Sequence, residues 1–322
     1  MPAKKAVTKK ATKRARKPAA DGKEPHKFRH KLLLNQWLIS LFGIDPFCTP
    51  NVLGVAKPLP FHALSSPIRD PRMEGLDQDG LHRFYHNLVN SQLFWGEQCV
   101  ITREQLRSYE ENIVRHTRVL NEKRDRPIAW KYYQWLTLVF VEIYLDRYFR
   151  SAEQLQADLN VFVNRFNKEW SNFANIAPYA LDDLNKVCIQ NATGSGKTLV
   201  MQVNVMQFRH YARKAGKDLP RTILITPNER LSEQHIADLR RAGYFVTEGV
   251  KPGAQTMLNQ IDVIEITKLG DKDGPKTIAT RNLGDENLLL VDEGHRGLSG
   301  QRAKEEGAFF SRRAAVCFHS VA

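Results

Sequence analysis

A run of eight residues, NATGSGKT at 191–198, has the residue types and spacing that bind a nucleoside triphosphate. Glycines in such a loop let backbone N–H groups approach the phosphates, the lysine reaches the β- and γ-phosphates, and the next hydroxyl ligates Mg²⁺. We therefore expect ATP and Mg²⁺ as ligands, with Lys197 as a catalytic cation and Thr198 as a metal ligand. The expected nucleotide-binding residues of this loop are Thr193, Gly194, Ser195, Gly196, Lys197 and Thr198.

A second segment, LLLVDEGH at 288–295, is an apolar strand that ends in two carboxylates. The carboxyl ends of parallel strands line the ligand crevice of a sheet, so Asp292 is expected to face Lys197 from an adjacent strand. Asp292 would hold Mg²⁺ through water, and Glu293 would orient or deprotonate the attacking water. His295 could link the nucleotide site to neighbouring motifs. The simpler alternative is an ordinary strand followed by a polar turn.

A third segment, Thr226, Pro227 and Asn228, follows the apolar strand 222–226. Its hydroxyl, amide and backbone N–H groups suit a nucleic-acid phosphate. Taken alone, the segment is equally typical of a strand-to-helix turn, because Pro and Asn favour turns.

Together these segments resemble the first motor lobe of superfamily-2 helicases, within the DEAD/DEAH-box proteins grouped with the restriction subunit of type III restriction enzymes. ATGSGKT, ILITPNERLSEQ and LLLVDEGHRG carry the resemblance, which covers residues 181–317. It implies that the P-loop residues bind ATP, that Asp292 and Glu293 serve Mg²⁺ and hydrolysis, and that Thr226 touches nucleic acid. It also favours DNA over RNA and implies a second motor lobe or a modification subunit as partner.

The elements that position these residues define an α/β fold. Strands near 222–226, 262–267 and 287–291 alternate with helices, which predicts a RecA-like parallel sheet. Residues 1–30 are expected to form a disordered basic tail, 31–180 a mostly helical domain, and 181–322 an incomplete first motor lobe. Expected helices lie near 31–43, 80–95, 103–121, 128–150, 152–170 and 231–241.

The composition of the chain gives further information about its class and its location in the cell. The 322 residues carry a net charge of +13, and residues 1–20 hold eight Lys or Arg and no acid. Such a tail cannot bury enough apolar surface to order itself, so it is a phosphate-binding arm, a solvated tail or a targeting segment. No apolar stretch has the ~20 residues that span a bilayer, and no membrane partner is expected. The four cysteines include no CxxC pair, which indicates reduced thiols and a cytoplasmic protein.

The remaining expectations concern what the lobe does alone. The sequence ends 29 residues after Glu293, before the next motif of the family and before a lobe carrying an arginine finger. We therefore expect a truncated frame or one half of a split motor, with weak ATP binding, little hydrolysis and no unwinding. A non-catalytic nucleic-acid-binding or interaction protein with a relic P-loop is the alternative. His82 and His86 are more typical of packing than of a metal site, and the aromatic stripe at 130–149 indicates a core.

Overall fold

The computed structural model describes residues 32–47, 51–52, 55–56, 59–95, 97–171, 175–192, 194–249, 257, 259–270, 274, 277–284, 287–293 and 314–321. The tail at 1–30 lies outside these residues, so its disorder stays a prediction.

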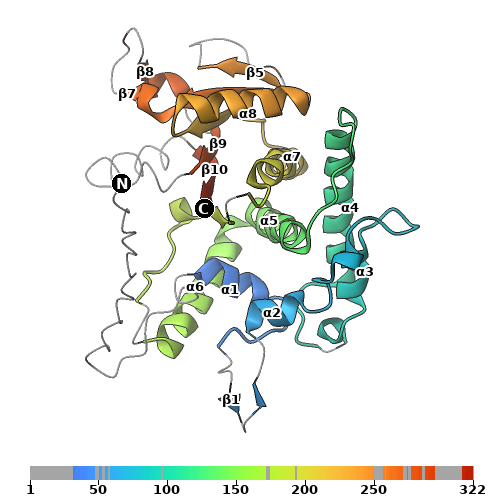
Figure 1. Cartoon of the computed structure of the whole chain (residues 1–322). Helices are drawn as coiled ribbons and strands as arrows, with labels where there is room; N and C mark the ends of the chain where they lie inside the picture. The colour runs from blue at the N-terminus through green and yellow to red at the C-terminus, as the bar shows by residue number, and fades with distance from the viewer. Residues whose placement is uncertain are drawn as a thin grey trace, which may run out of the picture.

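Most of the regular structure before the P-loop is helical (Figure 1). Thr102 opens one of them with a capping box, in which its side chain accepts the Gln105 N–H and the Gln105 side chain accepts the Thr102 N–H. Ser151 caps another by accepting the Gln154 N–H. The helices are α1 Leu33–Ser40, α2 Pro60–Ser65, α3 Arg83–Val89, α4 Arg103–Asn121, α5 Tyr132–Arg150 and α6 Ala152–Glu169.

Several predicted helix boundaries differ from the structure. Helix α1 is shorter at both ends than the predicted 31–43, and the helix predicted over 231–241 begins at Glu229. The helix predicted over 80–95 is divided into α3 and the 3-10 turn η3 Gln92–Phe94. Helix α5 begins four residues after the predicted start, because Asn121 accepts the N–H of Ile128 and Gln134 accepts the N–H of Lys131. These two contacts hold residues 128–131 outside helix α5.

A six-stranded sheet follows, and every neighbouring pair of its strands is parallel. The predicted α/β fold with a RecA-like parallel sheet is therefore confirmed. Helix α7, Lys197–Lys214, joins the first strand to the next, and helix α8, Glu229–Arg241, follows that strand. In spatial order the strands are β3 Lys186–Gln190, β10 Ala314–Val321, β9 Asn287–Asp292, β4 Thr222–Thr226, β6 Gln260–Glu265 and β5 Phe245–Glu248.

The order of the strands corrects one expectation. Strand β9, which carries the acidic pair, is not adjacent to the P-loop strand β3, because β10 pairs with both and lies between them. The sequence patterns also missed β5 and β10. Two minor sheets complete the described strands: β1 Asn51–Val52 with β2 Val55–Ala56, and β7 Leu269–Gly270 with β8 Ile278–Ala279.

The hydrophobic core is continuous from the helices into the sheet. Helix α7 packs against α4 and α5 on one side and against β10 on the other (Figure 1). Because side chains alternate along a strand, Leu224 and Leu290 join this core, while Ile225 and Leu289 form a second cluster on the opposite face. The division into a helical domain at 31–180 and a motor lobe at 181–322 stays a prediction.

The aromatic stripe packs in the core, as expected, and of the two histidines one is buried and one lies at the surface. Trp130 and Trp135 are fully buried. The His82 ring is buried and its Nδ1 lies 2.7 Å from the carboxylate of Glu110, while Nε2 of His86 contacts Asp79 at the surface. Among the described residues, no group of three or more His, Cys, Asp or Glu side chains is arranged to hold a metal ion.

Two further findings concern the described part of the chain only. Cys99 and Cys188 are not in disulfides. None of the described helices combines the length and the apolar character needed to cross a bilayer.

Candidate nucleotide site

The P-loop connects the end of β3 to the start of α7. Gly194 and Gly196 have φ angles of +78° and +81°, a left-handed conformation that glycine adopts without strain. Gly196 is the N-cap of α7, so the positive end of that helix opens at Lys197 and Thr198. Thr193 lies outside the described residues.

Lys197 and Glu293 form an ion pair across this site. Nζ of Lys197 lies 2.9 Å from Oε1 of Glu293, and the two side chains are only 11% and 14% exposed. The pair joins the start of α7 to the end of β9, although β10 separates the two strands that lead to it. The structure therefore brings together the two residues that the sequence predicts to be catalytic.

The backbone at Glu293 is unusual. Its φ of 51° makes Glu293 the one residue other than glycine with a positive φ among those described. Such a conformation costs roughly 1–2 kcal/mol in an L-residue and is often found at functional sites. Here the turn directs the Glu293 carboxylate to the lysine of the P-loop.

The neighbouring Asp292 is held by a residue that the motifs did not single out. Nε2 of His235, on α8, lies 2.8 Å from Oδ2 of Asp292, and both side chains are less than 10% exposed. Only the position of His235 on the helix that follows the Thr226–Asn228 segment, about two helical turns beyond it, could have drawn attention to it. His295, the histidine that the sequence did single out, lies outside the described residues.

Helix α5 also reaches the P-loop. Nε2 of Gln134 donates a hydrogen bond of 2.7 Å to the backbone carbonyl of Ser195, 61 residues along the chain. A Cβ atom on Gly196 would meet the same amide nitrogen, so the Gln134 side chain would have to move and give up this hydrogen bond. Glycine at 196 therefore allows helix α5 to approach the loop. The sequence did not predict the contact of Gln134, because its partner is a backbone atom of a distant segment.

The loop also contains polar side-chain atoms that fit a phosphate ligand. The Ser195 hydroxyl and Nδ2 of Asn191 are buried, and neither has a hydrogen-bond partner within the described residues. Buried polar atoms normally have partners, and donors beside a helix N-terminus suit anionic oxygens. Together with Lys197, these groups fit the triphosphate, and Thr198 with Asp292 supplies the oxygen atoms that Mg²⁺ prefers.

The turn after β4 differs in detail from its predicted role. Thr226 is only 1% exposed, and its hydroxyl lies 2.5 Å from the hydroxyl of Ser232. Oδ1 of Asn228 accepts the N–H of Leu231 and so caps α8. These side chains and Pro227 shape the start of α8, and a contact of the three residues with nucleic acid stays a prediction.

Fold and site together define a RecA-like lobe with a P-loop at the carboxyl ends of its parallel strands. Residues 105–315, about two thirds of the chain, match the family described as the type III restriction enzyme res subunit. The chain belongs to this family, and it carries a helicase-like ATP-binding motor domain of superfamily 2. The comparison with curated proteins finds no match.

Proposed function

We propose that this chain is the ATP-binding motor lobe of a DNA-directed superfamily-2 helicase or translocase of the type III restriction kind. The observation that carries the proposal is the contact of 2.9 Å between Lys197, at the start of α7, and Glu293, at the end of β9. A cation at the first turn of a P-loop helix and a carboxylate facing it are two of the side chains that hydrolysis of a triphosphate uses.

Each residue then has a separate task. Lys197 and the N–H groups at the start of α7 bind the phosphates, while Thr198 and Asp292 hold Mg²⁺. An Mg²⁺ ion held by these two residues would supply positive charge against the phosphate oxygens. Glu293 orients the attacking water and accepts its proton.

A triphosphate that binds Lys197 would have to displace Glu293 from it, because the two side chains are paired in the structure. The cavity beside the loop, which Lys197 lines with Asn191 and Phe318, measures only about 10 Å³. Lys197 therefore exchanges Glu293 for the phosphates when nucleotide binds, and this exchange releases the carboxylate to act on water.

DNA is the proposed track because the family is named for DNA restriction. Thr226, Pro227 and Asn228 lie where α8 begins, and α8 carries His235 to the carboxylate of Asp292. A modification subunit or a second motor lobe is the proposed protein partner. The predicted lack of unwinding by the chain alone, and its cytoplasmic location, remain predictions that strand-displacement and localisation experiments can test.

A nucleotide titration tests the proposal. MgATP binding is measured by calorimetry on the chain, on Lys197→Ala and on the control Lys168→Ala, which removes an exposed lysine of α6. We expect Lys197→Ala to weaken binding at least about tenfold, as loss of a charge-assisted hydrogen bond implies, and the control to bind like the parent. ATP hydrolysis with and without single-stranded DNA then tests whether DNA stimulates the lobe.

The alternative of a relic P-loop makes a different prediction. In that case the parent chain and Lys197→Ala show the same negligible affinity for MgATP. DNA binding that persists without any nucleotide effect would then favour a binding protein over a motor.

A further inference from the structure

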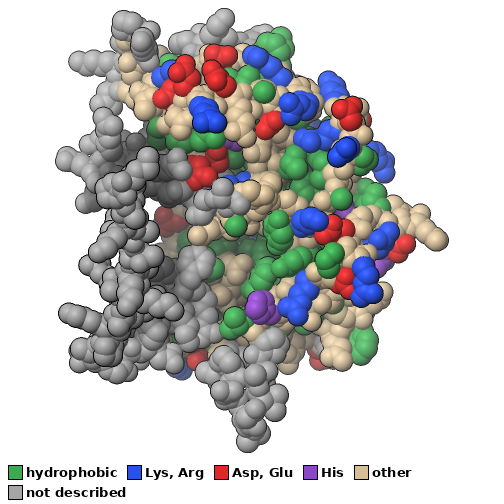
Figure 2. All heavy atoms as spheres, in the orientation of Figure 1, with side chains coloured by type: hydrophobic (Ala, Val, Ile, Leu, Met, Phe, Trp, Pro, Cys, Tyr) green, Lys and Arg blue, Asp and Glu red, His purple; other side chains and the backbone are tan. Residues whose placement is uncertain are grey.

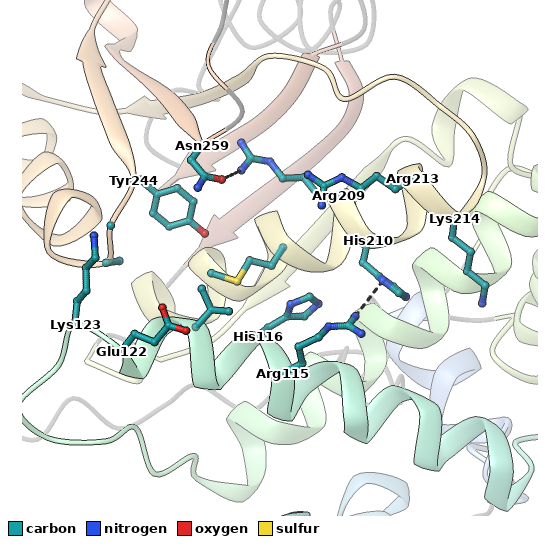
Figure 3. Close-up of a pocket in the computed structure, with 14 residues that line it drawn as sticks. Arg115, His116, Glu122, Lys123, Arg209, His210, Arg213, Lys214, Tyr244 and Asn259 are labelled. Carbon is teal, nitrogen blue, oxygen red and sulfur yellow. Dashed lines mark hydrogen bonds between the residues drawn. The ribbon is translucent and has the colours of Figure 1, made fainter.

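A cleft lies at the far end of α7 from the P-loop. It measures about 650 Å³ and opens between α4, α7 and the segment that leads into β5 (Figure 3). His210 lies thirteen residues after Lys197 on α7, which at 1.5 Å per residue is about 20 Å along the helix. The cleft is therefore separate from the proposed triphosphate site, and the inference does not depend on the proposed function.

The lining of this cleft is strongly basic. Figure 3 shows basic side chains that reach it from both α4 and α7. In Figure 2, Lys and Arg side chains gather over the upper part of α4 and the neighbouring helices. The charged and histidine residues of the lining are Arg115, His116, Glu122, Lys123, Arg209, His210, Arg213 and Lys214, of which only Glu122 is acidic.

The three arginines of this lining have no carboxylate partner among the described residues. Arg115 hydrogen-bonds Oδ1 of Asn112 at 2.7 Å and Nδ1 of His210 at 3.1 Å, and both partners are neutral acceptors. Arg209 is bound to Asn259 and to other uncharged oxygens. Lys214 lies 3.7 Å from Asp146, but among the described residues no carboxylate is within ion-pair distance of Arg115, Arg209 or Arg213.

His116 provides a second and independent indication of a ligand. Its side chain lines the cleft and the residue is only 7% exposed, yet its Nε2 atom is buried with no hydrogen-bond partner in the described structure. Burial, followed by the charge of Arg115, lowers the pKa of His116 to about 3, so the ring is neutral at physiological pH. In the tautomer that carries its proton on Nε2, this atom can donate to an anionic oxygen once the ring turns to expose it to the cleft.

We propose that this cleft binds a small phosphorylated molecule, with its phosphate group between Arg115, His116 and Arg213. The guanidinium fork matches phosphate oxygens in geometry as well as in charge. Val119 and Met206 supply apolar surface for the uncharged part of the ligand. The volume lies within the range of small-molecule sites.

A compact ligand fits the cleft better than a nucleic-acid strand does. Glu122 lies at the same end of the cleft as Lys123 and Tyr244, away from Arg115 and Lys214 (Figure 3). A nucleic-acid strand that ran through the cleft would bring its phosphates close to the Glu122 carboxylate, which would repel them. A short phosphorylated molecule can stay at the basic end.

Pyrophosphate binding tests the proposal. The titration is done by calorimetry without Mg²⁺ on the full chain carrying Lys197→Ala, which weakens any binding at the P-loop. Arg115→Ala and Arg213→Ala are added separately, and Arg118→Ala, one turn further along α4 and outside the lining, is the matched control. All three arginines are exposed, so the substitutions preserve the fold, which thermal unfolding verifies.

The expected result is a loss of about tenfold in affinity for each of Arg115→Ala and Arg213→Ala, as one charge-assisted hydrogen bond predicts, with no change for Arg118→Ala. Pyrophosphate should also shift the NMR signals of the His116 ring. The proposal is overturned if the parent does not bind, or if both cleft variants bind like the parent. It is equally overturned if these variants lose affinity only for a single-stranded oligonucleotide.

Discussion

His235 on α8 and Asp292 at the end of β9 are joined by a contact of 2.8 Å inside the protein. The contact links two segments that sequence patterns treat separately, the helix after the Thr226–Asn228 turn and the strand that ends in the acidic pair. The carboxylate of Asp292 thereby has one oxygen oriented by an imidazole. An outer partner of this kind orients a metal ligand and tunes its affinity for the metal.

Replacing His235 by alanine is therefore expected to weaken MgATP binding by about tenfold, the lower end of the effect of outer-shell partners. Nucleotide binding without Mg²⁺ should be unchanged, since Asp292 reaches the nucleotide only through the metal. Calorimetric titrations with and without Mg²⁺ measure both values. Glu233→Ala, an exposed substitution on the same helix, is the control, and an equal loss in both titrations would indicate a general structural defect instead.

Substitution of Glu293 by glutamine separates binding from hydrolysis. A triphosphate would compete with Glu293 for Lys197, because the two side chains are paired at 2.9 Å. We expect Glu293→Gln to raise ATP affinity by a few-fold, since a neutral amide holds the lysine less strongly and repels phosphate less. The same variant should lose any ATPase activity of the chain. A decrease in affinity would show that Glu293 supports binding, contrary to the exchange proposed above.

The two P-loop glycines are expected to respond differently to alanine. Both have positive φ, which costs an alanine roughly 1–2 kcal/mol of stability. A Cβ at Gly194 meets no atom within 4 Å, whereas one at Gly196 collides with Gln134. Gly196→Ala should therefore reduce both the free energy of unfolding and the ATP affinity by more than Gly194→Ala does.

A double-mutant cycle checks the cause of this difference. In a Gln134→Ala background the collision is absent, so the cost of Gly196→Ala should fall to the level of Gly194→Ala. Urea denaturation measures each variant. If the cost at Gly196 is the same in both backgrounds, the contact between α5 and the P-loop does not restrict this position.

A buried carboxylate in the helical layer makes stability depend on pH. Glu142 is fully buried and accepts hydrogen bonds from Asn112, Gln207 and Tyr211, and burial raises its pKa from 4.5 to about 7. The folded state thus binds the proton more tightly than the unfolded state. This stabilisation is complete below pH 4.5, declines as the pH rises, and is lost above about pH 7.

Glu142→Gln should remove this dependence. Relative to the parent, the free energy of unfolding of the variant should improve by about 3 kcal/mol between pH 5 and pH 8. Denaturant titrations at the two values measure it, with Glu169→Gln, an exposed change on α6, as the control. Parallel pH profiles for the parent and Glu142→Gln would show that Glu142 has an ordinary pKa.

Local patterns in the sequence determined much of this protein. Helix α4 and strand β4 have the predicted bounds, because a capping box, a helical period and an apolar run each act over a few residues. The P-loop lysine and the acidic pair were predictable for the same reason. Their chemistry depends on a short run of defined residue types after a strand, and Lys197 and Glu293 do meet.

Tertiary structure alone decided how the site is assembled. Strand β10 lies between β3 and β9, and Gln134 and His235 reach residues that are 61 and 57 positions away. Such contacts arise from the order in which parallel strands pair and from the packing of α5, α7 and α8 on them. No local pattern encodes them, because each depends on burying apolar faces that the chain brings together only when it folds.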